Sequence, residues 1–227
     1  MTKWDYIELR KLCKEKGIPD STLYQNSLGW RWKRTDFHAD KANEVWAELF
    51  MKSFTFVDQR CYEAIFSYEA HVESCVQSLH SMADILAQII NVIILGNEFP
   101  EHSISIKKVL KSMEDENAAP RVVESTRKLL ADSVFNYIEA FCNTIKHRRI
   151  IKTDFRAEYG ENARNESGLR FQEFTYKGSN FPQTWGSDIL KKYRFHIHQL
   201  ITEVGLNINR FVAESSLKKG RRTCRCT

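Results

Sequence analysis

The stretch SMADILAQIINVIILGN, residues 81–97, decides the fold class of this chain. Apolar side chains cover most of the girth of a helix built from it, which predicts that the helix is buried. The apolar run at 82–95 contains three polar residues and is too short to cross a bilayer. Gly96 and Asn97 tolerate the left-handed conformation that ends many helices. The sequence therefore predicts a long helix over residues 58–95, long enough to accommodate a break or a kink.

The composition favours one soluble helical domain. The chain has 227 residues, enough for one well-filled core, and its 9 Gly and 4 Pro leave little room for linkers or an all-β fold. The N-terminus lacks the basic-then-apolar order of a secretory signal, and the six cysteines lack the spacing of a disulfide framework. We therefore expect a cytoplasmic protein with reduced thiols that does not interact with a membrane.

Further helices are expected from apolar periodicity and from capping signals. They lie at residues 3–16, 39–51, 103–113, 120–149 and 184–215. Gly17, Pro19 and Gly29 predict a loop between the first two, and Asp36 or Asp40 could cap the second. Residues 1–56 are thus expected to form an N-terminal section of helices.

A β-hairpin is expected before the last helix. β-branched and aromatic residues replace the helical pattern at 150–159 and 169–176, and the polar stretch GENARNESG joins them. The predicted hairpin insertion covers residues 150–177. The expected fold is mainly α, a bundle of three long helices over 58–95, 120–149 and 184–215 with shorter ones and this hairpin. We expect a single domain over residues 1–216.

The C-terminal tail, residues 217–227, is basic. It contains five Lys and Arg residues and no acid, and the rest of the chain has 29 basic and 29 acidic residues. Such a tail could contact nucleic acid or an acidic partner. The alternative is a frayed, solvated terminus.

The helix expected over 120–149 carries two distinct stripes. One is an apolar core stripe formed by Val134, Ile138, Phe141 and Ile145. The other is small or polar, and consists of Asn136, Ala140, Asn143 and His147. Solvent-facing helix surfaces usually carry Lys and Glu, so this second stripe indicates a sheltered cleft or a subunit interface.

A polar line also follows the long helix over 58–95. It consists of Glu69, Glu73, Gln77, His80, Asp84, Gln88 and Asn91. Buried polar groups need partners, and the two polar stripes could supply them by facing each other. His80, Asp84 and Gln88 could then bond to groups near His147, orient them or shift their pKa. The alternative is a buried network that sets the register of the bundle and has no catalytic role.

Three cations flank His147. Lys146, Arg148 and Arg149 concentrate positive potential at the end of the helix, where a phosphate could bind. Arg148 and Lys146 each lie about 100° from His147 around the helix, within reach of the same phosphate, whereas Arg149 points farther away.

The stretch NTIKHRR, residues 143–149, and the order of the helices resemble the HEPN superfamily, the higher eukaryotes and prokaryotes nucleotide-binding domains. The resemblance implies an RNA-directed protein, and many members are metal-independent RNases of toxin, antiphage and RNA-processing systems. They usually form homodimers with the motif helices lining a shared cleft. By this resemblance His147 is the acid or base and Asn143 orients the phosphate. No metal or cofactor is implied, and an antitoxin or regulatory protein is a possible partner.

The chain departs from the family motif at one position. That motif has Arg, usually followed by a polar residue, with four to six residues between Arg and His. Cys142 occupies the four-residue position, and Phe141 and Ala140 occupy the other two. If the protein cleaves RNA, then Lys146, Arg148 or Arg149 must stabilise the phosphorane in place of the arginine. Two alternatives are a non-catalytic module that binds RNA, nucleotide or a protein partner, and an unrelated helical interaction protein.

The stretch WRWKR, residues 30–34, interleaves aromatic rings with cations. This pairing can stack bases and bind phosphates. The preferred alternative is that both Trp side chains anchor a loop onto the bundle while the charges stay in water. Elsewhere Cys224 and Cys226 have too few companions for a zinc site, and His196 and His198 lie about 200° apart on a helix.

Overall fold

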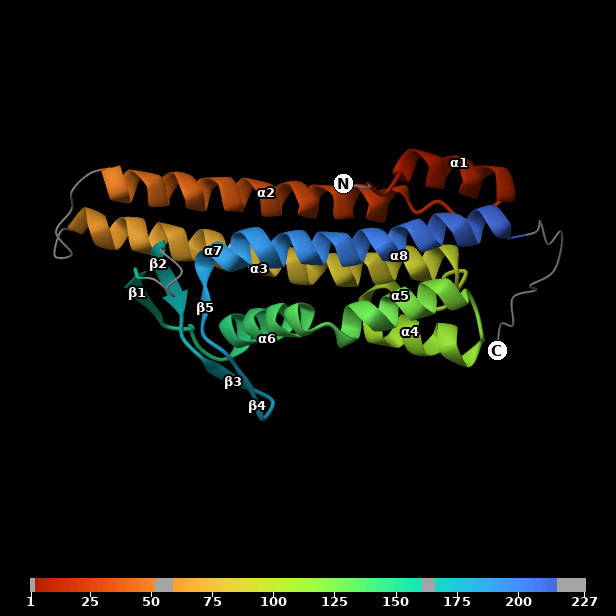
Figure 1. Cartoon of the computed structure of the whole chain (residues 1–227). Helices are drawn as coiled ribbons and strands as arrows, with labels where there is room; N and C mark the ends of the chain where they lie inside the picture. The colour runs from red at the N-terminus through yellow and green to blue at the C-terminus, as the bar shows by residue number, and fades with distance from the viewer. Residues whose placement is uncertain (1–2, 52–58, 161–165, 216–227) are drawn as a thin grey trace.

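The computed structural model describes residues 3–51, 59–160 and 166–215 of the chain. Three long helices run alongside one another, α2 (Thr22–Met51), α3 (Gln59–Ile93) and α8 (Arg194–Glu214). A second layer covers the side of α3 and α8 opposite α2, and consists of α4 (Ile106–Asp115), α5 (Pro120–Ala131) and α6 (Ser133–His147) (Figure 1). The short α1 (Tyr6–Lys16) packs on α8. The mainly α fold class is confirmed.

The helix α3 is buried along most of its length, as its sequence predicts. Leu79, Met82, Leu86 and Ile90 have no exposed surface, and α2, α4, α6 and α8 all pack against this helix. It is one continuous helix of 35 residues, without the break that its length could have accommodated. The left-handed residues that end it are those expected, Gly96 at φ 62° and Asn97 at φ 63°.

Asn91, the last residue of the polar line that runs along α3, has a structural role. Its side-chain amide donates to the carbonyl of Phe99 at 3.0 Å, and its side-chain oxygen accepts from the Phe99 N–H at 3.1 Å. The buried amide therefore fixes the path of the chain beyond α3, as the structural reading of the polar line anticipated.

The predicted loop is present at Gly17 and Pro19, but its extension to residue 38 is wrong, because α2 begins at Thr22 and continues through Gly29, Asp36 and Asp40. Asp20 accepts from the backbone N–H of Thr22 at 2.8 Å at the start of this helix. Leu28, Thr35, Ala39 and Ala42 are buried at helical spacing. Packing of this face against α3 outweighs the low helix propensity of one glycine, which costs about 1 kcal/mol relative to Ala.

The single helix predicted over 120–149 is two helices. Asp132 between them is extended, at φ −69° and ψ 133°, and its carboxylate accepts from the N–H groups of Val134 and Phe135, both at 2.9 Å. The same side chain contacts the Nε2 of His196 on α8 at 2.8 Å. An N-cap with a tertiary partner thus sets a new helix direction, and α2 takes the place of 120–149 among the three long helices.

The predicted hairpin is present, with more strands than expected. Strands β1 (Thr153–Glu158), β2 (Glu166–Phe171) and β5 (Thr184–Trp185) form one antiparallel sheet, while β3 (Phe174–Tyr176) and β4 (Ser179–Phe181) form a second hairpin. The short α7 (Gly186–Asp188) and a π-helical turn (Ile189–Tyr193) lead into α8, so the final helix begins later than residue 184. Aromatic contacts between these strands and Tyr137 and Phe141 attach the hairpins to α6.

No helix in the described ranges is long and apolar enough to cross a membrane. The four cysteines in this part of the chain, Cys13, Cys61, Cys75 and Cys142, are free and buried, as expected for reduced thiols. Cys224, Cys226 and the basic tail lie outside the described residues. The domain limits 1–216 and 1–56 remain predictions.

Removing the cap between α5 and α6 should destabilise the fold. We expect Asp132→Ala to lower the free energy of unfolding by about 1 kcal/mol, because two N–H groups lose their acceptor. Asp132→Asn keeps an acceptor oxygen and should retain most of the stability. Urea unfolding of both variants measures this, and equal midpoints for Asp132→Ala and the wild type would contradict it.

Candidate functional site

A cleft of about 220 Å³ lies where α3, α4, α6 and the β3–β4 hairpin meet. The helix α3 contributes His80 and Asp84 to its lining, and α6 contributes Asn143. Lys107 of α4 and Lys177 of the hairpin lie on its other sides. The cleft therefore brings together polar groups from four segments that are distant in the sequence.

The two polar stripes meet at this cleft, but only over part of their length. His80 and Asp84 share it with Asn143, as the facing arrangement required. Gln88 does not take part, since its side-chain amide donates to the carbonyl of Glu101 at 3.0 Å beside a neighbouring groove. Ala140 of the second stripe is buried.

Asn143 and His147 are placed differently. Asn143 is half-buried, and one of its amide N–H groups donates to the carbonyl of Glu139 at 2.8 Å, which leaves the second N–H for another acceptor. His147 is the last residue of α6, is exposed, and is not among the residues that line the cleft. It lies one helical turn beyond Asn143, on the same side of α6.

Burial and nearby charge shift the titrating groups of the cleft. Burial lowers the pKa of His80, which Asp84 opposes and Lys146 reinforces. Burial also raises the pKa of Asp84, which the charges of His80 and Lys146 oppose. Lys146 therefore acts electrostatically on both residues from the opposite helix.

Lys146 also reaches the position at which the family motif has its arginine. Cys142 has no exposed surface, and burial raises its pKa, while the charge of Lys146 and a hydrogen bond from it lower that pKa. The side chains at 140 and 141 are buried as well. All three possible arginine positions thus hold buried side chains, whereas Lys146, one turn after the first of them, is exposed.

Among the cations, Lys107 and Lys177 line the cleft, whereas Lys146, Arg148 and Arg149 are not among its lining residues. The guanidinium of Arg148 lies 5.2 Å from the ring centroid of Tyr176, and the ammonium of Lys177 lies 5.2 Å from the same centroid. Lys107 forms an ion pair with Glu139 at 2.8 Å. Arg149 is exposed. Tyr176 thus gathers two cations at the rim, on the hairpin side.

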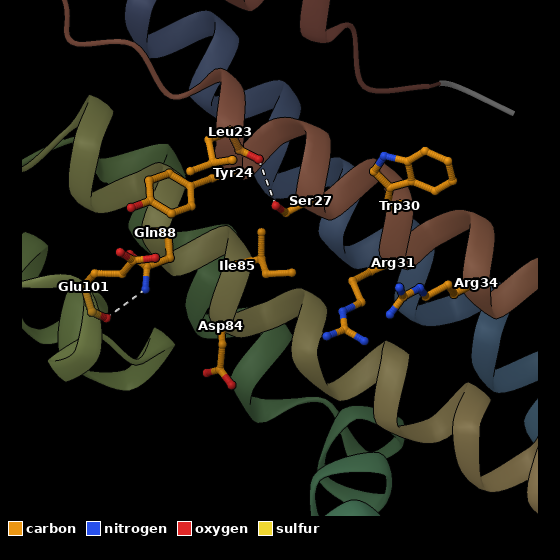
Figure 2. Close-up of a pocket in the computed structure, with 10 residues that line it drawn as sticks. All are labelled: Leu23, Tyr24, Ser27, Trp30, Arg31, Arg34, Asp84, Ile85, Gln88 and Glu101. Carbon is orange, nitrogen blue, oxygen red and sulfur yellow. Dashed lines mark hydrogen bonds between the residues drawn. The ribbon is translucent and has the colours of Figure 1, made fainter.

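A larger groove of about 710 Å³ lies between α2 and α3 and shares Asp84 with the cleft (Figure 2). Tyr24, Trp30, Arg31 and Arg34 line it from α2. WRWKR is a candidate site in the sequence, but it was expected in a loop. Because this stretch is helical, its side chains point to different sides of α2. Helical periodicity through Gly29 was the signal that could have found this groove.

The two tryptophans of this stretch have different roles. Trp32 packs on the core, with its ring centroid 4.1 Å from that of His198. The prediction that the Trp side chains anchor this stretch onto the bundle is therefore correct for Trp32. Trp30 is 63% exposed, with the ammonium of Lys33 at 4.9 Å from its ring. The same prediction is therefore wrong for Trp30. The anchored segment is a helix and not a loop.

Comparison with known proteins identifies a family. The family model described as Cthe2314-like HEPN matches residues 15–202, which include α2 to α6, the hairpins and part of α8. No curated protein and no solved structure matches the chain. Within residues 3–51, 59–160 and 166–215, no group of three or more His, Cys, Asp or Glu side chains is placed to hold a metal ion.

The contact between α2 and α8 should make stability depend on pH. His198 is buried against Trp32 and Thr35, and burial, with the charge of Arg194, lowers its pKa to about 3. The unfolded chain takes up this proton below about pH 6.5, while the folded protein does not. Stability is therefore greatest above that pH and falls by about 2 kcal/mol from pH 7 to pH 5.

Urea unfolding at the two pH values tests this, with His198→Gln as the comparison. The variant keeps a hydrogen-bonding side chain and lacks the titration, so its stability should fall less than that of the wild type. An identical fall in both proteins would refute the assignment to His198.

Proposed function

Because the chain belongs to the Cthe2314-like HEPN family, we propose that it binds RNA at the cleft between α3 and α6. HEPN domains often bind RNA, so family membership indicates a nucleotide- or RNA-related function. One observation carries the proposal to this cleft: the positive charge of Lys146, an exposed residue next to the lining, acts on Cys142 at the motif position and on His80 and Asp84 of the cleft. It supplies a cation where the family motif would supply its arginine.

The chemistry of the lining fits a nucleic-acid backbone. Asn143 lines the cleft, and its free amide N–H can donate to a phosphate oxygen. Lys146 and Arg148 are exposed beside the cleft and are not part of its lining, and their long side chains can bind the same phosphate. The Asp84 carboxylate would repel a phosphate, but it can accept a hydrogen bond from a ribose 2′-hydroxyl. The cleft is thus suited to the alternating phosphates and hydroxyls of RNA, with phosphate toward α6 and sugar toward α3.

Metal-independent cleavage of RNA is the second candidate function. It is favoured by the exposed imidazole of His147, one turn beyond Asn143 and next to Lys146. In such a reaction a base takes the proton of the 2′-hydroxyl, an acid protonates the leaving 5′-oxygen, and a cation stabilises the phosphorane. His147 is the proposed acid or base, Asn143 orients the phosphate, Lys146 stabilises its charge, and His80 and Asp84 position these groups.

The biological setting belongs to the same proposal. By the resemblance to HEPN proteins, the protein acts in the cytoplasm as a homodimer in a microbial toxin or antiphage system, with an antitoxin or regulatory protein as partner. A dimer would allow the exposed ends of two α6 helices to share one substrate. Arg149 and the basic tail would then add to the positive surface.

RNA binding is tested by fluorescence anisotropy with a labelled single-stranded RNA. Lys146→Ala should weaken binding about 5- to 10-fold and reduce the salt slope by somewhat less than one, the effect of losing one phosphate contact. The matched control is Lys11→Ala on α1, a lysine that is 76% exposed and lies at the far end of the molecule. Equal affinities of Lys146→Ala and this control would contradict the proposed site.

Cleavage is tested by incubating the purified protein with mixed RNA in EDTA, alongside folded His147→Ala and Asn143→Ala variants. If His147 transfers a proton, its loss should slow cleavage by about 10²- to 10⁴-fold. The Asn143→Ala variant should also be slower. Wild-type protein without activity would leave the chain as a binding module, and activity unchanged in His147→Ala would refute the role of this residue.

A further inference from the structure

The groove between α2 and α3 is lined by two cations, Arg31 and Arg34, and by two carboxylates, Asp84 and Glu101. Figure 2 shows Arg31 and Arg34 side by side on the face of α2 that lines the groove. In the parts of the chain that the structure describes, no carboxylate forms an ion pair with either guanidinium. Other arginines there do have such partners, as Arg194 has Asp36 and Arg127 has Glu114.

Each of the two charges disfavours the other. Burial lowers the pKa of Arg31, and the positive charge of Arg34 lowers it further. A half-buried cation beside a like charge is electrostatically unfavourable, and an anion bound between the two guanidinium groups would relieve that repulsion. The part of the groove at Arg31 and Arg34 therefore favours a negative group, while Asp84 and Glu101 make the rest of the lining acidic (Figure 2).

Aromatic side chains accompany these cations. Tyr24 is half-buried in the groove, one turn and a half before Trp30 along α2, and Leu23 and Ile85 add apolar surface. Trp30 is largely exposed at the rim, with Lys33 against its ring. Rings beside guanidinium groups are the combination that stacks unpaired bases and binds the phosphates between them.

The groove adjoins the proposed RNA site, because Asp84 lines both hollows. A strand that leaves the cleft between α3 and α6 would cross Asp84 to enter the groove. The volume of about 710 Å³ suits a nucleotide unit, since small-molecule pockets measure about 300–1,000 Å³.

We infer that the groove between α2 and α3 binds a base and phosphate of single-stranded RNA, next to the phosphate and ribose bound at the cleft between α3 and α6. Arg31 and Arg34 bind the phosphate, and Trp30 at the rim stacks the base, while Tyr24 lies at the other end of the groove (Figure 2). A duplex does not fit this role, because its base faces are covered by their neighbours. The inference rests on the proposed RNA-binding function and specifies single-stranded RNA as its ligand.

The test measures anisotropy of the full chain with a labelled single-stranded RNA of about 12 nucleotides, a length within the range of single-strand binding sites. Arg31→Ala/Arg34→Ala should bind at least 10-fold more weakly, and its salt slope should fall by about 1.4 for two lost phosphate contacts. The control is Arg121→Ala/Arg127→Ala on α5, which removes two arginines that are 60% and 59% exposed. It should bind like the wild type.

Substitutions of Trp30 test base stacking separately from the effect of charge. We expect Trp30→Ala to weaken binding about 5- to 100-fold, the range that corresponds to loss of one base stack, and Trp30→Phe to restore most of it. The Trp30 side chain is largely exposed, so neither change should unfold the protein. A Trp30→Phe variant as weak as Trp30→Ala would overturn the stacking role.

The two proposals fail in different ways. If Lys146→Ala weakens binding and the Arg31→Ala/Arg34→Ala variant does not, the cleft binds RNA and the groove inference is wrong. If the wild type binds no RNA, both are wrong. If the duplex of the same sequence binds as tightly as the single strand and loses the same affinity in the double variant, the assignment to single-stranded RNA is overturned.

Discussion

The burial of α3 is the constraint on which the rest of the structure depends. Four helices pack around it, so each polar side chain along its length must find a partner or reach solvent. Asn91 finds its partner in the backbone at Phe99, and Gln88 finds one at Glu101. His80 and Asp84 instead line the cleft beside α6, and Asp84 also lines the groove beside α2. The candidate site lies where the helical packing around α3 is incomplete.

The geometry of α6 follows from one residue. Asp132 ends the extended break after α5 and caps the new helix, and its contact with His196 ties that break to α8. With this direction set, aromatic contacts hold α6 against the hairpins, Asn143 lines the cleft, and Cys142 turns into the core. The family's arginine position is therefore closed to solvent, and a lysine one turn later lies beside it.

Much of this was predictable from the sequence, and the failures have clear physical causes. Periodicity predicts the apolar girth of α3 and the meeting of His80 and Asp84 with Asn143. Residue types predict the left-handed end of this helix and the hairpin. The start of α2 was missed because Gly29 indicates a loop locally, whereas burial of Leu28 and Thr35 against the bundle overrides it. Pro19 does lie in the loop before this helix. The break at Asp132 depends on a tertiary partner 64 residues away, which periodicity cannot reveal.

The central claim is that RNA enters the cleft between α3 and α6 with a phosphate on Lys146. A crystal structure of the protein with a short single-stranded RNA tests it most directly. We predict a phosphate oxygen within hydrogen-bonding distance of the Lys146 ammonium, with the adjoining ribose toward Asp84. An RNA strand bound on another face of the molecule, with this cleft free of nucleotide, would contradict the account.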